Sequence, residues 1–253
     1  MSYNGMFSDI FLKLAARLEK KSSYAQGKGY GAGTIKMENG LVHKLLKNKP
    51  LLAVDIGGNV GEYSAELRRR NPDLEIHVFE PSSVNIEKLI QRFGGDQWIH
   101  VIPHALSDKA DSAVLYSNVA GSGLGSLTQR RLDHFNIEFD VKETVKTIRF
   151  EDYWRDSLGC RTLDIVKIDI EGHELTALNG FGDAINNTRV LQFEFGGCNI
   201  DTRTYFQDFW YYFKDKGFHL YRITPHGLQR VERYTEADEF FSTTNYIAVN
   251  NKL

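Results

Sequence analysis

The stretch LLAVDIGGNVG at residues 51–61 decides the fold. Its first six residues form a short apolar run, which is typical of a strand buried on both faces of a parallel sheet. Gly57, Gly58 and Gly61 follow, where the chain turns into a helix predicted over residues 60–70. Glycines at such a turn let the backbone approach a ligand closely and take positive φ values. The stretch therefore predicts a ligand site at the carboxyl end of the first strand.

Strands and helices alternate along the rest of the chain. Apolar runs predict further strands at residues 75–80, 98–103, 143–150, 163–170, 189–195, 217–223 and 244–250. Helical patterns cover residues 82–93, 173–178 and 205–216, the first of them with Ser82 as a cap. This alternation predicts an α/β fold, a doubly wound and mostly parallel sheet with helices on both faces.

The N-terminal part, residues 1–48, is expected to be separate from a main domain at residues 49–253. Apolar side chains recur there at helical spacing: Phe7, Ile10, Phe11, Leu14, Ala15 and Leu18. This helix is expected to pack on the main domain or on a second subunit of a homo-oligomer. A basic amphipathic helix on a membrane surface is the alternative. Residues 22–33 are rich in glycine and serine, which predicts a flexible joint or a mobile flap.

Composition excludes several classes of protein. The 253 residues carry a net charge of −2, so no basic excess draws the chain to nucleic acid, and we do not expect a nucleic-acid partner. No apolar run approaches the roughly 18 residues of a membrane span, and the first residues do not resemble a signal peptide. Cys160 and Cys198 stand alone, without zinc-ligand spacing. A cytoplasmic location is therefore predicted.

The glycine turn does not fit the common nucleotide motifs. In a dinucleotide-binding G-x-G-x-x-G the positions of Asn59 and Glu62 would be glycines, and no phosphate-binding GKS or GKT is present. What remains is D-x-G-x-x-x-G from Asp55, with Glu80 at the end of the next strand. A carboxylate there can accept both hydroxyls of a ribose. Asp55 is placed to stabilise a cation. S-adenosylmethionine (SAM) carries a ribose, a sulfonium and an ammonium, so this pair predicts SAM as the cofactor.

Four motifs in order resemble one family. DIGGNVGEYS at 55–64 is similar to the first motif of class I SAM-dependent methyltransferases, and most resembles the D-x-G-A-N-x-G of the FkbM family, with Gly58 in place of the usual alanine. VFEP at 78–81, HALSD at 104–108 and VKIDIEGHE at 166–174 resemble the family's later motifs. The resemblance covers roughly residues 50–250.

The resemblance implies a Rossmann-like class I methyltransferase sheet with strand order 3-2-1-4-5-7-6 and strand 7 antiparallel. It also implies methyl transfer to an oxygen, here to a hydroxyl of a sugar, glycan or glycosylated small molecule. Ala105 and Leu106 would flank the adenine. The cofactor-binding residues expected from the motifs are Asp55, Gly57, Gly58, Asn59, Gly61, Glu80, Pro81, Ala105, Leu106 and Asp169.

An alcohol attacks a methyl group only when its proton is removed, so a base or a metal ion is needed. Asp169 and Glu171 end one predicted strand, Glu194 ends the neighbouring one, and His173 begins the next helix, where the helix N-terminus favours a neutral imidazole. Two mechanisms stay open. His173 or Asp169 could take the proton directly. Alternatively, Asp169 and Glu194, with Glu171 or Asn199, could hold Mg²⁺.

A glycine-rich loop and an aromatic helix have further expected roles. The loop GSGLGS at 121–126 is suited to close over a polar acceptor, and the aromatic helix at 205–216 is expected to belong to the core.

A ribose 2′-O-methyltransferase acting on nucleic acid is one rival function, although no lysine follows the strand at 189–195 as that class requires. A SAM-binding or partner-binding module without activity is the other.

Overall fold

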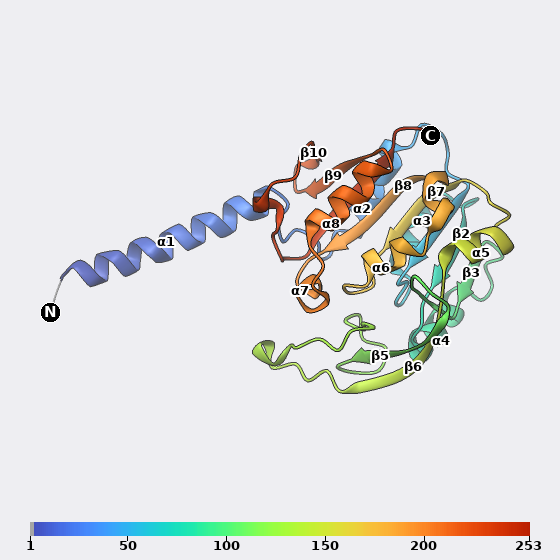
Figure 1. Ribbon diagram of the computed structural model, residues 1–253, viewed down its shortest axis with the longest axis horizontal. Coiled ribbons are helices and arrows are strands. Elements are labelled where there is room, and N and C mark those ends of the chain that lie inside the picture. The colour runs from blue at the N-terminus through green and yellow to red at the C-terminus, as the bar shows by residue number, and fades with distance from the viewer. Residues whose placement is uncertain (1–2) are drawn as a thin grey trace.

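The computed structural model describes residues 3–253, and places them in a sheet with helices on both faces, a smaller sheet and a projecting N-terminal helix (Figure 1). The eight-stranded sheet has the order β10-β9-β11-β8-β7-β1-β2-β3. Its strands are β1 Leu52–Ile56, β2 Glu75–Phe79, β3 Ile99–Ile102, β7 Leu163–Ile168, β8 Thr188–Phe195, β9 Phe218–Thr224, β10 Gly227–Val231 and β11 Thr244–Asn250.

The sheet confirms the predicted order. Read from β3 inward, the strands β3, β2, β1, β7, β8, β11 and β9 correspond to 3-2-1-4-5-7-6. The first five are parallel to one another, and β11 is antiparallel to both β8 and β9, as expected of strand 7. A hairpin adds β10 at the β9 edge, which the sequence did not predict.

Helices cover both faces because the inner strands are apolar on both sides. The helices are α2 Ile35–Leu45, α3 Glu62–Arg70, α4 Ser83–Phe93, α5 Phe150–Asp156, α6 Glu174–Asn179, α7 Cys198–Thr202 and α8 Phe206–Asp215, with 3₁₀ turns at Asp133–Phe135, Gly182–Asn187 and Glu236–Asp238. Val54 and Ile56 of β1 belong to the core under α5, α6 and α8, and Ala53 to the core under α2, α3 and α4. The fully buried Phe209 of α8 stacks on Phe193 at 4.9 Å, so the aromatic helix belongs to the core as expected.

A second sheet of three strands stands apart from the first. It contains β4 Ala105–Leu106, β5 Asp111–Ser117 and β6 Val141–Ile148, in the order β4-β6-β5. The strand predicted at 143–150 is therefore not part of the main sheet. Its alternation of exposed and buried residues explains the difference, because a pair of antiparallel strands with one solvated face alternates, whereas the central strands are buried throughout.

The N-terminal helix α1, Tyr3–Ala25, extends away from the rest of the molecule (Figure 1). The side chains of Ile10, Phe11, Leu14 and Leu18 are 58%, 68%, 54% and 59% exposed, while the side chain of Phe7 lies outside the described part. The helix is present as predicted, and of the two expected ways to cover its stripe the single chain does not show packing on the main domain, so packing on a second subunit stays a prediction. A homo-oligomer stays a prediction.

The glycine-rich segment after α1 lies against the main sheet. Gly29 N donates to Thr244 Oγ1 at 3.1 Å, and Asn245 Nδ2 donates to the carbonyl of Gly31 at 3.3 Å. In α2, the buried Glu38 accepts hydrogen bonds from Gln192 at 2.7 Å and from Asn245 at 3.0 Å. These contacts connect residues 29–38 to strands β8 and β11, and the division at residue 48 stays a prediction.

The structure bears on the expectations about a membrane span and about the two cysteines. None of the helices in the described part of the chain has the length and apolar character needed to cross a bilayer. Cys160 is exposed and Cys198 is buried, and both are free thiols.

Candidate functional site

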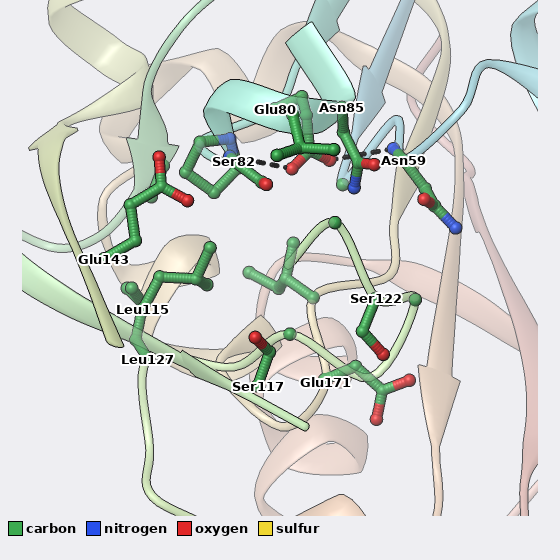
Figure 2. A pocket seen from close by; sticks show the side chains of 18 of the residues that line it. Asn59, Glu80, Ser82, Asn85, Leu115, Ser117, Ser122, Leu127, Glu143 and Glu171 are labelled. Atoms are coloured by element: carbon green, nitrogen blue, oxygen red, sulfur yellow. Dashed lines mark hydrogen bonds between the residues drawn. The ribbon is translucent and has the colours of Figure 1, made fainter. Parts of the chain in front are cut away.

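A cavity of ≈ 280 Å³ lies at the carboxyl ends of β1, β2 and β7 (Figure 2). The glycine turn, the end of β2, β4, the loop at 121–125 and the end of β7 all contribute to its wall. The predicted site residues that line it are Gly57, Asn59, Glu80, Pro81, Ala105, Leu106, Asp169, Glu171 and His173. Segments far apart in the sequence therefore meet here, as expected for the carboxyl edge of a parallel sheet.

Close packing requires glycine at two positions of the turn, Gly57 and Gly58. Gly57 has φ +82°, and a Cβ there would lie 1.9 Å from the carbonyl oxygen of Asp169. A Cβ on Gly58 would lie 2.2 Å from Val78 Cγ1. The small residue at 58, where the family resemblance predicts alanine, is thus matched to the valine on the neighbouring strand.

Glu80 is fixed with its carboxylate at the cavity. It is 6% exposed, and its two oxygens accept hydrogen bonds from Asn59 N at 2.8 Å and from Ser82 N at 2.9 Å (Figure 2). Burial raises the pKa of this carboxyl, while the two backbone donors oppose the rise. Ser82 begins α4 as predicted, but its side chain makes no capping hydrogen bond. The carboxylate is therefore held at the carboxyl end of β2, where an acidic residue binds the ribose in folds of this kind.

Several buried polar atoms around the cavity have no partner within the described residues. Among them are Asn59 Oδ1, Ser82 Oγ and His104 Nδ1, all from residues of the cavity wall. Unsatisfied buried polar atoms are costly, so three of them at one cavity indicate a polar ligand. Apolar side chains, including Leu106, Leu115 and Leu127, complete the wall.

Three predicted cofactor residues do not line this cavity. Asp55 is fully buried behind the turn, where its Oδ2 accepts a hydrogen bond from Ser64 Oγ at 2.6 Å. Its burial raises its pKa, and Lys167 opposes that rise. Gly58 packs on β2, and Gly61 is the residue before α3, with φ +80°. Their direct contact with a cofactor stays a prediction.

Three of the four predicted catalytic residues come together. Asp169, Glu171 and Glu194 each offer a carboxylate oxygen, and these oxygens lie within 4.8 Å of one another. Burial raises the pKa of Glu171 to about 7 and that of Glu194 well above its usual range, and repulsion from Asp169 adds to both shifts. The cluster therefore favours taking up positive charge, either as protons or as a cation. Asn199, offered as a further metal ligand, instead accepts a hydrogen bond from Gly196 N at 2.8 Å.

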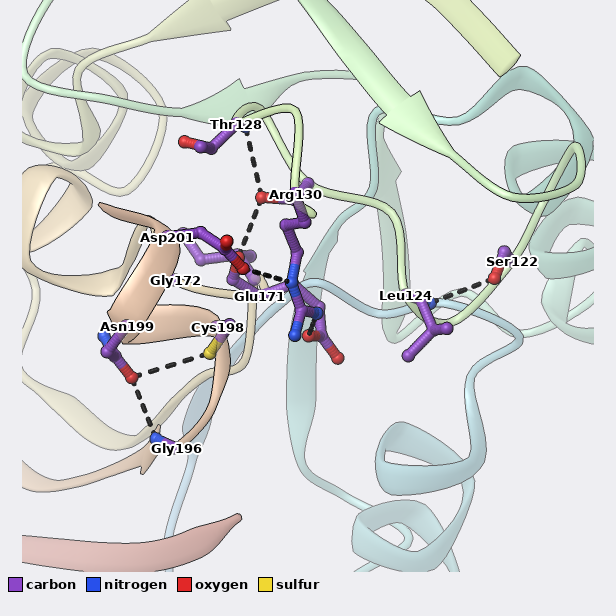
Figure 3. A network of polar contacts seen from close by, with 12 residues as sticks. Ser122, Leu124, Thr128, Arg130, Glu171, Gly172, Gly196, Cys198, Asn199 and Asp201 are labelled. Atoms are coloured by element: carbon purple, nitrogen blue, oxygen red, sulfur yellow. Dashed lines mark hydrogen bonds and ion pairs between the residues drawn. The ribbon is translucent and has the colours of Figure 1, made fainter. Parts of the chain in front are cut away.

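The turn that carries Glu171 is tightly specified. Glu171 has φ +54°, a conformation that residues other than glycine adopt at a cost. The fully buried Glu174 holds this turn, because its Oε1 accepts hydrogen bonds from Ile170 N at 2.9 Å and Gly172 N at 3.1 Å. From the other side, Arg130 Nη1 donates to Glu171 Oε2 at 2.6 Å, and Arg130 Nε pairs with Asp201 Oδ2 at 3.3 Å (Figure 3).

His173 lines the first cavity together with Asp169 and Glu171, but it does not belong to the carboxylate cluster. It is the residue before α6, and its Nε2 is 3.4 Å from Ser107 Oγ. Its pKa is lowered, as expected, but burial is the cause, and Asp108 opposes the shift. A neutral imidazole therefore faces the cavity.

A second and larger cavity, of ≈ 1260 Å³, adjoins two of these carboxylates. It is bordered by the end of α1, by Arg130, Cys198 and residues 240–243, and by Glu171 and Glu194. Glu171 borders both cavities. A ligand in each would meet at this side chain.

Sequence reasoning missed two functional candidates. Lys167 is buried, and its Nζ lies 2.9 Å from Asp169 Oδ2. It belongs to the quoted motif VKIDIEGHE, so the motif itself was the signal. Arg130 lies 41 positions before Glu171 in a segment without periodicity, and nothing in the sequence connects the two.

Comparison with known proteins identifies the family. A model described as the methyltransferase FkbM domain matches residues 55–220, more than half of the chain. The chain belongs to the FkbM methyltransferase domain family. This FkbM domain is 24% identical over 196 residues to the 2-O-methyltransferase NoeI of Sinorhizobium fredii, a match covering 74% of this chain and 78% of that protein.

Two solved structures were also found as partial matches. An FkbM methyltransferase from Methylobacillus flagellatus has a TM-score of 0.49 at 19% identity, over 81% of this chain; the match spans only 45% of that longer chain. A methyltransferase from Streptococcus mutans, solved with SAH, has a TM-score of 0.46 at 8% identity, over 85% of this chain and 96% of that one.

The FkbM family implies SAM as methyl donor, and the first cavity fits it. Glu80 would accept the ribose hydroxyls, and the unpartnered Asn59 Oδ1 would accept a hydrogen bond from the ammonium or a hydroxyl. The apolar wall near Leu106 and Leu115 would contact the adenine. Asp169 and Glu171 would then lie toward the methyl group.

Proposed function

We propose that this FkbM domain methylates a hydroxyl group of a sugar, glycan or glycosylated small molecule bound in the second cavity. The observation that carries the proposal is the position of Glu171, which borders both cavities. An oxygen acceptor is also what the name of its relative NoeI, a 2-O-methyltransferase, describes. The carboxylates and Arg130 at the junction offer the hydrogen bonds that a polyhydroxylated acceptor needs.

The chain's residues would act as follows. When bound, SAM supplies an electrophilic methyl group on sulfur. Glu171 faces the acceptor side as a carboxylate, and Arg130 engages its Oε2. The hydroxyl proton passes to Glu171 as the C–O bond forms, and the electron pair of the broken S–C bond stays on sulfur. We prefer Glu171 to His173 and Asp169 as the base because these two border only the first of the two cavities.

A divalent cation is the alternative route to an activated hydroxyl. Asp169, Glu171 and Glu194 are hard oxygen ligands gathered within 4.8 Å, which suits Mg²⁺. Such an ion would acidify the hydroxyl directly, and the three carboxylates would then be ligands. Lys167 already neutralises Asp169, which favours the route without metal.

Methyl transfer from labelled SAM to a panel of methyl glycosides, with an RNA oligonucleotide as a separate acceptor, tests the proposal. We expect Glu171→Gln to lower turnover by about 10²–10⁴-fold, the usual contribution of a general base, while SAM affinity measured by calorimetry changes little. The control is Glu87→Gln, an exposed residue on α4. The assay is run with EDTA and with Mg²⁺.

Each outcome separates the alternatives. Turnover that EDTA abolishes and Mg²⁺ restores would establish the metal route. Unchanged turnover in Glu171→Gln would refute this residue as base. SAM binding without label in any hydroxylated acceptor would refute the acceptor class and favour the rival module without activity; label in an RNA ribose would favour the nucleic-acid rival.

A further inference from the structure

Helix α1 presents an apolar stripe that nothing in the described chain covers. Ile10, Phe11, Leu14 and Leu18 follow one another at i, i+1, i+4 and i+8, so they lie on one side of the helix. All four are more than half exposed. Scattered exposed apolar residues are ordinary, but four on one face of one helix indicate a surface that binds a partner or a membrane.

Positive charge accompanies this stripe. Lys13, Arg17 and Lys21 follow at intervals of four, and Lys20 lies beside them, all exposed. Arg17 is three residues after Leu14 and Lys21 three after Leu18, so these cations border the stripe directly. The helix has four cations and two acids, Asp9 and Glu19, although the whole chain has a net charge of −2. Its charge is therefore opposite in sign to that of the molecule.

The same face of α1 reaches the proposed acceptor site. Leu14, Arg17, Leu18 and Lys21 border the second cavity, together with Glu171 and Glu194. Whatever the stripe contacts is thus presented beside the mouth of this cavity.

We propose that α1 binds the surface of an anionic lipid bilayer through this stripe and its cations. An interfacial helix needs apolar side chains for the acyl boundary and flanking cations for the headgroups, and α1 supplies both. A second copy of the chain fits less well, because it would bring the same cations together, with only Asp9 and Glu19 to balance them. Resting on the proposed function, the consequence is that acceptors anchored in such a surface meet the second cavity first.

Co-sedimentation of the full chain with vesicles tests the inference without any turnover. We expect binding to vesicles of mixed phosphatidylglycerol and phosphatidylcholine, and weaker binding to phosphatidylcholine alone. Arg17→Ala/Lys21→Ala should weaken binding roughly 30-fold, since each cation near such a surface contributes about 1 kcal/mol. Leu14→Ser/Leu18→Ser should abolish binding at high salt, where the apolar contacts alone remain.

Matched controls are available on α4. Lys88→Ala and Ile90→Ser remove an exposed cation and an apolar residue that is 55% exposed, and both variants should bind vesicles like the wild type. SAM binding by every variant shows that the domain is folded.

Three results would overturn the inference. The first is equal vesicle binding by the α1 variants and the wild type. The second is no vesicle binding by a chain that binds SAM. The third is a lipid-free dimer that Leu14→Ser/Leu18→Ser dissociates, which would assign the stripe to a second copy. Loss of SAM binding by the wild type would instead contradict the proposed function.

Discussion

Arg130 Nη1 lies 2.6 Å from Glu171 Oε2, and this contact joins the segment between β5 and β6 to the turn after β7. Arg130 also pairs with Asp201 in α7, so one guanidinium bridges two carboxylates from different elements. Its side chain is only 10% exposed, and such partly buried pairs hold their elements more firmly than surface pairs do. The segment over the first cavity is therefore fastened at the site where the two cavities meet.

Arg130→Met should release this segment. We expect faster amide hydrogen exchange over residues 118–132, because the charged bridge to Glu171 and Asp201 is lost. The control is Arg131→Met, whose side chain is 86% exposed and pairs only with Asp133 at the surface. Equal exchange in the two variants would show that the bridge does not order the segment.

Glu80→Gln should weaken SAM binding about 10- to 100-fold. The change removes a charged acceptor, and hydrogen bonds to charged groups contribute about 1.5–3 kcal/mol. Isothermal titration against SAM and SAH measures it, with Glu87→Gln as the control. Wild-type affinity in Glu80→Gln would remove this carboxylate from the ribose site.

Gly58→Ala should lower the free energy of unfolding by about 1–3 kcal/mol, the usual cost of overpacking. The cause is the Cβ that would lie 2.2 Å from Val78 Cγ1, so Gly58→Ala/Val78→Ala should be coupled and lose less than the two single changes together. Urea unfolding measures both. Gly95→Ala is the control, because nothing lies within 4 Å of its added Cβ. Strict additivity in the double variant would refute the steric explanation.

Glu66 provides a pH-dependent prediction away from the site. Hydrogen bonds from Arg69, and then from Arg70, lower the pKa of this carboxyl to about 2. A lowered pKa stabilises the folded state fully above the ordinary value of 4.5, and this contribution is lost as the pH falls toward about 2. Glu66→Gln should therefore lower the free energy of unfolding by about 1 kcal/mol at pH 7, since solvent screens the exposed Arg69.

The difference in the free energy of unfolding between Glu66→Gln and the wild type should shrink steadily below pH 4. Urea unfolding at several pH values follows it, with Glu87→Gln as reference. A difference independent of pH would mean that packing, not charge, is lost.

The sequence predicted the elements that can be recognised from a short run of consecutive residues. The runs that became β1, β2, β7 and β8 are rich in apolar residues and almost entirely buried, and the strand order followed from the family resemblance. The cavity residues Gly57, Glu80 and Asp169 were found because each ends a strand, and strand ends meet at one edge.

What the sequence did not predict depends on contacts between distant segments. The smaller sheet pairs β4 with β6, although β5 and a long loop lie between them in the sequence. Whether α1 packs on its own domain depends on surfaces elsewhere, and its amphipathic pattern is the same in either case. Arg130 was missed for the same reason, since its partners Glu171 and Asp201 are identified only by the fold.

Helix α2 places a constraint on the order in which the domain can be assembled. Glu38 is bonded to Asn245, 207 positions further along, and the latter belongs to the last strand of the chain. During synthesis, α2 leaves the ribosome long before β11, so Glu38 can pair with Thr34 and later with Gln192, but not yet with Asn245. Closing so long a loop is slow. The nascent domain therefore holds Glu38 without this contact until β11 is made, and a truncation that removes Asn245 also removes a contact of α2, 207 positions earlier.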